Sequence, residues 1–255
     1  MVKKVTVNTI QKYKDNNEKF SVLTAYDYST AKYIDEAGVD IVLIGDSLAM
    51  VALGYETTHS VGMEEMSIFT KAAAKGVQRA MVVTDMPFLS YHTDIPSAVK
   101  NCGEMIKLGA NAVKIEGFNE HILNVIRRLV ETGIPVMGHL GFTPQFLNTL
   151  GGYKIQGKNR EAAEEILIQA KELENAGESA KYISENLHVP TISCGAGKYC
   201  DAQVLVSDDV FGKYSDFKPK FARKYGDMKT LIYECAKKFD KDVKSGNFPS
   251  EEEIF

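Results

Sequence analysis

Short apolar runs alternate along the chain with segments whose apolar residues recur every three or four positions. The run DIVLIGD is nearly all apolar, as expected for a parallel strand that is covered on both faces. This pattern predicts strands at residues 21–27, 40–46, 80–85, 112–117, 135–142 and 190–197, and from residue 203. It predicts helices at residues 29–38, 63–78, 94–109, 122–130, 160–177 and 178–187, and within residues 219–244.

The alternation fails once, between Gly177 and Glu178, where one helical pattern follows another without a strand. A barrel of alternating strands and helices has eight strands, but this sequence predicts only seven. The missing strand is the sixth in chain order. We predict an α/β fold, a TIM-type (β/α)8 barrel that lacks the sixth strand. Residues 1–255 are expected to form a single domain, with an N-terminal helix and a C-terminal helical extension. The two strands beside the vacancy are expected to have unpaired edges.

Composition limits the classes of partner. The chain has 255 residues and a formal net charge of −4, which gives no electrostatic field that would attract nucleic acid or anionic lipid. No apolar run approaches the roughly 18 residues of a membrane span. The four cysteines are scattered without metal-binding spacing, as in reduced cytosolic proteins. We expect a cytoplasmic enzyme that binds neither nucleic acid nor a membrane.

Acidic residues stand at the carboxyl ends of three successive predicted strands, where (β/α)8 barrels carry their working residues. These residues are Asp46, Asp85 and Glu116. Carboxylates held close together repel one another unless a cation lies between them. An all-oxygen set of ligands with open positions suits Mg²⁺. The sequence therefore predicts a Mg²⁺ site at this end of the strands.

Two further polar residues, Lys114 and His139, lie in predicted strands near the acidic residues. Each of them could have a purely structural role instead of a role in the site. Lys114 lies two residues before Glu116, so both side chains point to one face of the strand. His139 lies in the fifth predicted strand. Lys114 could be only a salt-bridge partner of Glu116, and His139 only a hydrogen-bonded core histidine. Asp27 and Asp46 each follow a strand, and either could cap the next helix instead.

Five segments of the chain form a distinctive series: TAYDYSTAKYIDEAGVDIVLIGDSLAMVALGYETT at 24–58, MVVTDMPF at 81–88, AVKIEG at 112–117, PVMGHLGFTPQ at 135–145 and GGYKIQGK at 151–158. In this order and spacing they resemble the ketopantoate hydroxymethyltransferase family. The resemblance implies a (β/α)8 barrel, Mg²⁺ and transfer of a hydroxymethyl group from 5,10-methylenetetrahydrofolate to 3-methyl-2-oxobutanoate. The product would be 2-dehydropantoate, in pantothenate biosynthesis. A large homo-oligomer, a homodecamer, is also implied.

The resemblance also implies roles for individual residues. It assigns the metal shell to Asp46, Asp85 and Glu116. It assigns contacts with the keto acid to Asp46, Ser47, Asp85, Lys114 and His139. Among these, Ser47 and Lys114 would hold the carboxylate of the keto acid. A metal that binds the keto oxygen would polarise the carbonyl group and so favour loss of the C3 proton.

One motif of the family is absent. The family's sixth strand ends in Glu-Cys-Val-Pro, and the resemblance implies that this Glu is the general base. Here LENAG, ending at Gly177, runs directly into ESAKY, beginning at Glu178, and about ten residues are missing, roughly one strand and its turn. Glu178 matches the helix that follows the motif, so the catalytic base stays unknown. Two alternatives remain open: an inactive relative that binds Mg²⁺ and a 2-oxo acid without turnover, or another Mg²⁺-dependent 2-oxo acid lyase or aldolase.

Overall fold

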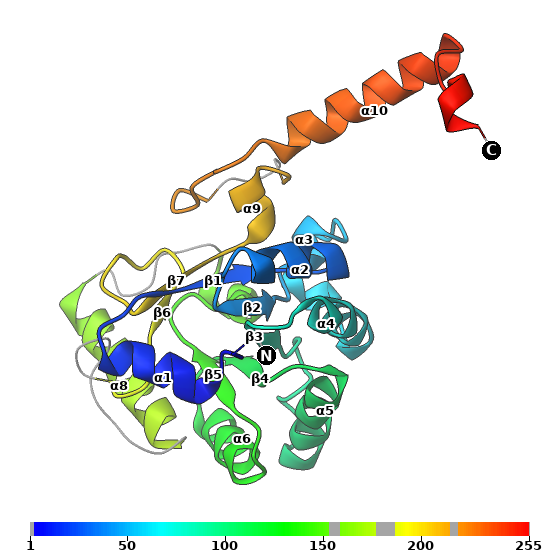
Figure 1. Ribbon diagram of the computed structural model, residues 1–255. Coiled ribbons are helices and arrows are strands. Elements are labelled where there is room, and N and C mark those ends of the chain that lie inside the picture. The colour runs from blue at the N-terminus through cyan, green and yellow to red at the C-terminus, as the bar shows by residue number, and fades with distance from the viewer. Residues whose placement is uncertain (1–2, 153–158, 177–186, 215–218, 255) are drawn as a thin grey trace. The chain divides into compact units, whose positions relative to one another are not determined.

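The sheet is the frame of the molecule. The computed structural model describes residues 3–152, 159–176, 187–214 and 219–254. Seven strands form one sheet in the order β5-β4-β3-β2-β1-β7-β6 (Figure 1). They are β1 (Phe20–Thr24), β2 (Ile41–Ile44), β3 (Met81–Asp85), β4 (Ala112–Glu116), β5 (Val136–His139), β6 (Ile192–Ser193) and β7 (Ala202–Leu205). The predicted α/β alternation is confirmed.

The helices between β1 and β5 connect these strands and lie on the outer face of the curved sheet (Figure 1). The α-helices are α1 (Val7–Asp15), α2 (Tyr28–Glu36), α3 (Leu48–Val51), α4 (Met63–Gly76), α5 (Ile95–Leu108), α6 (Glu120–Glu131), α7 (Leu147–Leu150), α8 (Arg160–Ala176), α9 (Ser207–Phe211) and α10 (Met228–Lys244). Three 3-10 turns are η1 (Thr58–Ser60), η2 (Pro144–Phe146) and η3 (Glu251–Glu253). The helix predicted at residues 178–187 lies, except for residue 187, outside the described residues.

Side-chain caps fix where several helices begin. Asp27 accepts a hydrogen bond from the Thr30 amide at 2.8 Å and so caps α2. The capping alternative for Asp27 is therefore confirmed. Asp94 caps α5 and Asn119 caps α6 in the same way. Such caps satisfy amide groups that the first helical turn cannot pair internally.

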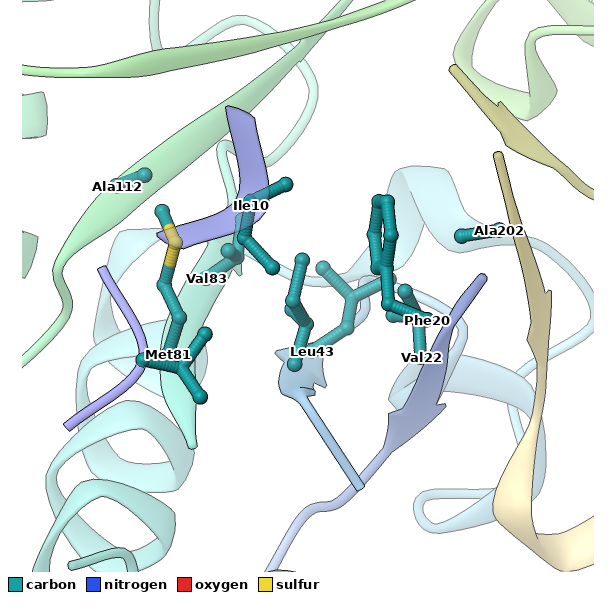
Figure 2. Close-up of a cluster of buried hydrophobic side chains, with 10 residues drawn as sticks. Ile10, Phe20, Val22, Leu43, Met81, Val83, Ala112 and Ala202 are labelled. Carbon is teal, nitrogen blue, oxygen red and sulfur yellow. The ribbon is translucent and has the colours of Figure 1, made fainter. Parts of the chain in front are cut away.

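Apolar side chains fill the interior near the amino ends of the strands. Val22, Ile41 and Met81 lie opposite one another in the parallel register, and Leu43 and Val83 form the next row. All five are buried in one hydrophobic cluster (Figure 2). Because side chains alternate between the two faces of a strand, this face continues to the carboxyl ends, where its residues become polar.

Helix α1 contributes to this core. Ile10 is buried in the cluster, and Figure 2 shows its side chain between those of Met81 and Phe20. Tyr13, one turn further along α1, stacks on Phe20 with ring centroids 6.1 Å apart. Phe20 is the first residue of β1, so α1 covers the amino end of the sheet. The interior is thereby closed at the end opposite the polar residues.

The sheet is open where the sequence predicts a missing strand. β5 and β6 are its two outermost strands, and no strand lies between them in the described part of the chain. Every residue of β2 and β3 is buried, whereas no residue of β5 is fully buried. The prediction of two edge strands beside the vacancy is confirmed. β6 is shorter than the predicted strand at 190–197, because Gly195 and Gly197 have positive φ angles that interrupt extended backbone.

Hydrogen bonds connect the chain on both sides of the opening. The buried carboxylate of Glu174, near the end of α8, accepts hydrogen bonds from the amides of His188 and Val189 at 2.7 and 3.0 Å. Gln11 of α1 donates to the His188 carbonyl at 2.7 Å. These contacts hold the segment that leads into β6 against α8 and α1.

A buried carboxylate also fixes the connection from α4 to β3. Asp35 of α2 accepts hydrogen bonds from three successive amides, those of Gln78, Arg79 and Ala80, at 2.6–3.1 Å. Its side chain is buried. Hydrogen bonds to an ionised acceptor are roughly twice as strong as neutral ones.

We expect Asp35→Asn to lower the free energy of unfolding by about 2 kcal/mol, because a neutral amide offers one acceptor oxygen and turns an N–H toward these donors. Urea denaturation at pH 7 measures the loss. The matched control is Glu36→Gln, the next residue, whose exposed carboxylate lies 3.8 Å from Lys32. The control should change stability by less than about 0.5 kcal/mol. Equal effects of the two substitutions would contradict a structural role for Asp35.

Residues 205–255 form a second compact unit. In this unit the amides of Tyr225 and Gly226 donate to the Val210 carbonyl, at 2.7 and 3.2 Å, which joins the segment before α10 to α9. No residue of α10 is buried. Among the described residues, no helix combines the length and the apolar character that crossing a membrane requires.

Candidate functional site

Three acidic side chains meet at the carboxyl ends of neighbouring strands. Asp46 follows β2, and Asp85 and Glu116 are the last residues of β3 and β4. One carboxylate oxygen from each lies within 4.8 Å of the others. All three residues are buried, with 3%, 3% and 1% of their surface exposed. The structure therefore brings together the three acids that the sequence selects.

Lys114 lies among these carboxylates. Its Nζ atom is 2.8 Å from Asp85 Oδ2 and 3.2 Å from Glu116 Oε1. The predicted shared face of Lys114 and Glu116 is thereby confirmed, and the salt-bridge alternative describes part of its contacts. Burial lowers the pKa of Lys114, but the carboxylates of Asp85, Glu116 and Asp46 outweigh burial and hold the pKa above its ordinary value. The ammonium group therefore stays charged, although the side chain is only 11% exposed.

His139 completes this row of polar residues. It lies opposite Glu116 in the register of β4 and β5, and its Nδ1 atom is 2.8 Å from Glu116 Oε1. Burial raises the pKa of Glu116, but the charges of Lys114 and His139 outweigh burial and lower the pKa to about 2. Glu116 is therefore ionised at neutral pH, and its carboxylate fixes one edge of the imidazole ring.

The cluster carries the marks of a cation site. Burial, and then the charges of Asp85 and Glu116, raise the pKa of Asp46 well above its ordinary value. Asp85 Oδ1 is buried and has no hydrogen-bond partner among the described residues. A buried oxygen without a partner and a carboxyl pushed toward its neutral form are both expected where a bound cation belongs. An all-oxygen donor set suits a hard divalent cation, so these residues fit a metal such as Mg²⁺.

Ser47 lies beside the cluster, next to Asp46. Its Oγ is 2.9 Å from the Tyr26 hydroxyl. A Cβ atom at Gly45 would lie 2.7 Å from this Oγ, so a side chain there would displace the Ser47 hydroxyl. The Asp46 amide donates to Asp85 Oδ2 at 3.0 Å, which joins the ends of β2 and β3. The tight turn after β2 thus brings Asp46 and Ser47 to the same site.

Sequence reasoning missed two residues of this site, Gln145 and Tyr91. Gln145 lies in η2 and donates from its side chain to Asp46 Oδ2 at 3.0 Å and from its amide to Glu116 Oε2 at 3.2 Å. The Tyr91 hydroxyl donates to Gln145 Oε1 at 2.8 Å. Gln145 ends the segment PVMGHLGFTPQ, but a single glutamine in a loop gives no local signal of such contacts.

Solved structures with the same fold support the barrel assignment. Phosphonopyruvate hydrolase in complex with oxalate and Mg²⁺ has a TM-score of 0.55, with 12% sequence identity over 98% of this chain and 93% of that chain. A 2,3-dimethylmalate lyase has a TM-score of 0.57, with 13% identity over 100% of this chain and 89% of that chain. At these identities the likeness shows the fold alone.

Relatives of much higher identity match the chain over nearly its whole length. A 3-methyl-2-oxobutanoate hydroxymethyltransferase of Clostridium botulinum (strain 657 / Type Ba4) is 48% identical over 262 residues, covering 98% of this chain and 95% of the relative. The protein of the same name from Thermoanaerobacter sp. (strain X514) is 46% identical over 267 residues, covering 100% of this chain and 97% of the relative. Both alignments are longer than the 255 residues of this chain, so the relatives carry residues that have no counterpart here. The family model for ketopantoate hydroxymethyltransferase matches residues 4–251, and the chain therefore belongs to the ketopantoate hydroxymethyltransferase family.

Proposed function

We propose that the chain is a Mg²⁺-dependent hydroxymethyltransferase. It would transfer a hydroxymethyl group from 5,10-methylenetetrahydrofolate to 3-methyl-2-oxobutanoate and give 2-dehydropantoate, in pantothenate biosynthesis. The observation that carries this proposal is the buried cluster of Asp46, Asp85 and Glu116 around Lys114, in a chain 48% identical to a 3-methyl-2-oxobutanoate hydroxymethyltransferase. A 2-oxo acid has a carboxylate for the ammonium group and a keto oxygen that a metal can polarise.

The three carboxylates would hold the metal. Asp46, Asp85 and Glu116 offer oxygen ligands from three strand ends. Mg²⁺, when bound, supplies Lewis-acid polarisation of the keto group. Three carboxylates and one ammonium leave two negative charges, which a divalent cation would neutralise. The buried Oδ1 atom of Asp85, to which the described part of the chain offers no hydrogen-bond partner, supports the same assignment.

The neighbouring side chains would bind and orient the keto acid. Lys114, held in its charged form, would neutralise the substrate carboxylate without changing its own protonation state. Ser47, whose hydroxyl lies against Tyr26, would donate a hydrogen bond to the same carboxylate. His139, with one ring edge fixed by Glu116, would contact the substrate with the other edge.

A second candidate function is binding of Mg²⁺ and a 2-oxo acid without turnover. Two observations favour it. The sheet is open between β5 and β6, and the alignments with the relatives are longer than this chain, so the chain lacks residues that the relatives have. The resemblance implies that the general base belongs to the missing segment. A positioned base contributes about 10²–10⁴-fold to a proton-transfer step. The two candidates therefore differ in the rate at which the C3 proton is removed.

Exchange of the C3 proton of 3-methyl-2-oxobutanoate with D₂O, followed by NMR without folate, tests the two candidates. Transferase function predicts Mg²⁺-dependent exchange above the protein-free rate, abolished by a chelator, and product formation when 5,10-methylenetetrahydrofolate is added. Broadened ligand lines without exchange would support binding alone. Absence of both signals would refute the proposed site.

Replacement of Asp46 tests the metal site through stability. The pKa of Asp46 is raised in the folded protein, so above its ordinary pKa of 3.8 the fold retains a proton that the unfolded chain has lost. This group therefore contributes stability that is present at low pH and is lost as pH rises through the raised pKa. We expect metal-free Asp46→Asn to be more stable than the wild type at pH 7.5, by about 1 kcal/mol, the usual gain when a strained functional residue is relieved.

Two further measurements complete this test. The gain in stability should vanish toward pH 3.8, where the wild-type carboxyl is neutral as well. Mg²⁺ should raise the melting temperature of the wild type but not of Asp46→Asn. The matched control is Asp240→Asn, which removes an exposed carboxylate 2.8 Å from Lys244 and should leave the Mg²⁺ response unchanged. A variant that is less stable than the wild type at pH 7.5 would contradict the assignment of a cation to this cluster.

The proposed assembly is a homodecamer. Helix α10 leaves large apolar side chains exposed, with exposed fractions of 62% for Leu231 and 58% for Phe239. Contact between copies of the chain would cover such residues. Analytical ultracentrifugation measures the assembly, and a monomer at micromolar concentration would refute it.

A further inference from the structure

Gln145 has more contacts at the acidic cluster than its sequence position suggests. Gln145 is only 3% exposed, and it contacts residues at the ends of β2, β3 and β4. The side-chain Nε2 donates to Asp46 Oδ2 at 3.0 Å and to the Met86 carbonyl at 2.8 Å. The Oε1 atom accepts from the Tyr91 hydroxyl at 2.8 Å. Every donor and acceptor of the side-chain amide therefore has a partner.

The backbone of Gln145 is held as firmly as its side chain. Its amide donates to Glu116 Oε2 at 3.2 Å. Its carbonyl oxygen is 2.8 Å from His59 Nε2, in η1. Gln145 thus contacts Asp46 through the side chain and Glu116 through the main chain. One residue, which lies after β5, therefore holds two of the three acids.

The neighbouring groups determine the orientation of the side-chain amide. Asp46 Oδ2 and the Met86 carbonyl are both acceptors, so the NH₂ group must face them. The Tyr91 hydroxyl accepts from the Glu116 amide at 3.2 Å and has two acceptors in reach, the Glu116 carbonyl at 3.2 Å and, nearer, Gln145 Oε1 at 2.8 Å. A reversed amide would place Oε1 against two acceptors, Asp46 Oδ2 and the Met86 carbonyl, and would leave Tyr91 without its nearer acceptor. The amide therefore has one satisfied orientation.

We propose that Gln145 is a positioning residue that sets the geometry of the acidic cluster for its cation. Because Gln145 occupies Asp46 Oδ2, the other carboxylate oxygen of Asp46 is directed to the cation. Its main-chain amide holds Glu116 through Oε2, while Lys114 and His139 hold the same carboxylate through Oε1. Tyr91 supports this arrangement through Gln145 Oε1 and through the main chain of Glu116. This inference rests on the metal site of the proposed function and deepens it.

Mg²⁺ affinity of the folded protein, measured by calorimetry without substrate, tests the proposal. Gln145→Met keeps the length of the side chain and the main-chain contact with Glu116, but it removes the hydrogen bond to Asp46. We expect its affinity for Mg²⁺ to fall about 10–100-fold, the usual cost of losing a group that orients a metal ligand. Tyr91→Phe leaves both N–H donors in place and should cause a smaller loss. The double variant should lose less affinity than the sum of the two single losses, because the two side chains share a hydrogen bond.

The control is Asn111→Ala, which removes a hydrogen bond of 2.9 Å to the Val82 amide at the opposite end of β4. Its Mg²⁺ affinity should equal that of the wild type. Wild-type affinity in Gln145→Met would overturn the positioning role and leave the proposed function intact. If Gln145→Met does not fold, wild-type affinity in Tyr91→Phe would overturn the role instead. A wild-type protein that binds no Mg²⁺ would refute the metal site itself, and the positioning role with it.

Discussion

Restoring the missing segment is expected to raise transferase turnover about 10³-fold. The insertion would carry the residues of the Clostridium botulinum relative that have no counterpart here, placed between Gly177 and Glu178. A positioned general base contributes about 10²–10⁴-fold, and the resemblance implies that the base belongs to this segment. The same residues would supply a strand between β5 and β6, which are now the two outermost strands. Stability should therefore rise together with turnover.

The matched control is the same insertion with its motif glutamate replaced by glutamine. This variant should gain the stability of the closed sheet but not the turnover, because Gln cannot accept the C3 proton. Initial rates with 5,10-methylenetetrahydrofolate give the turnover, and urea denaturation gives the stability. Equal turnover of the two insertions would mean that the base lies elsewhere in the chain. An unchanged melting transition would contradict a strand at this position.

The sequence predicted those parts of the fold that local pattern determines. The run DIVLIGD predicted a strand covered on both faces, and Ile41–Ile44 is buried throughout. The vacancy was visible because two helical patterns met at Gly177. Packing between distant parts of the chain determines the other features. The short helix α1 covers the core because Ile10 packs against side chains of the strands. No local periodicity encodes such a contact.

The candidate site was predictable to the same extent. Asp85 and Glu116 could be selected because the carboxyl ends of parallel strands meet at one edge of a sheet. Asp27 and Asp46 could not be distinguished, because both follow a strand and precede a helix. The structure separates them: Asp27 caps α2, whereas Asp46 joins the acidic cluster. Gln145 was missed because it contacts Asp46 across 99 residues of sequence.

Removing the ammonium group of Lys114, whose side chain is 11% exposed, should produce the largest loss of stability. In Lys114→Met the carboxylates of Asp85 and Glu116 lose an ion-pair partner at 2.8 and 3.2 Å, with almost no solvent to replace it. Breaking a buried pair by removing one partner costs about 3–5 kcal/mol, because the remaining charge is uncompensated. We expect a loss of this size at pH 7 in metal-free protein, measured by urea denaturation. The control is Lys32→Met, which removes an exposed ammonium 3.8 Å from Glu36 and should cost less than about 1 kcal/mol.

The pH dependence and the metal dependence of this loss distinguish charge from packing. In the wild type the pKa of Glu116 is about 2, since Lys114 and His139 together outweigh burial. Without Lys114 this pKa rises, so the variant's deficit is greatest at neutral pH and shrinks as falling pH neutralises the carboxyl groups. Mg²⁺ should recover part of the deficit, because a divalent cation replaces the missing positive charge. A deficit that is independent of both pH and Mg²⁺ would show that Lys114 stabilises the fold by packing alone, and that the three acids are not coupled through their charge.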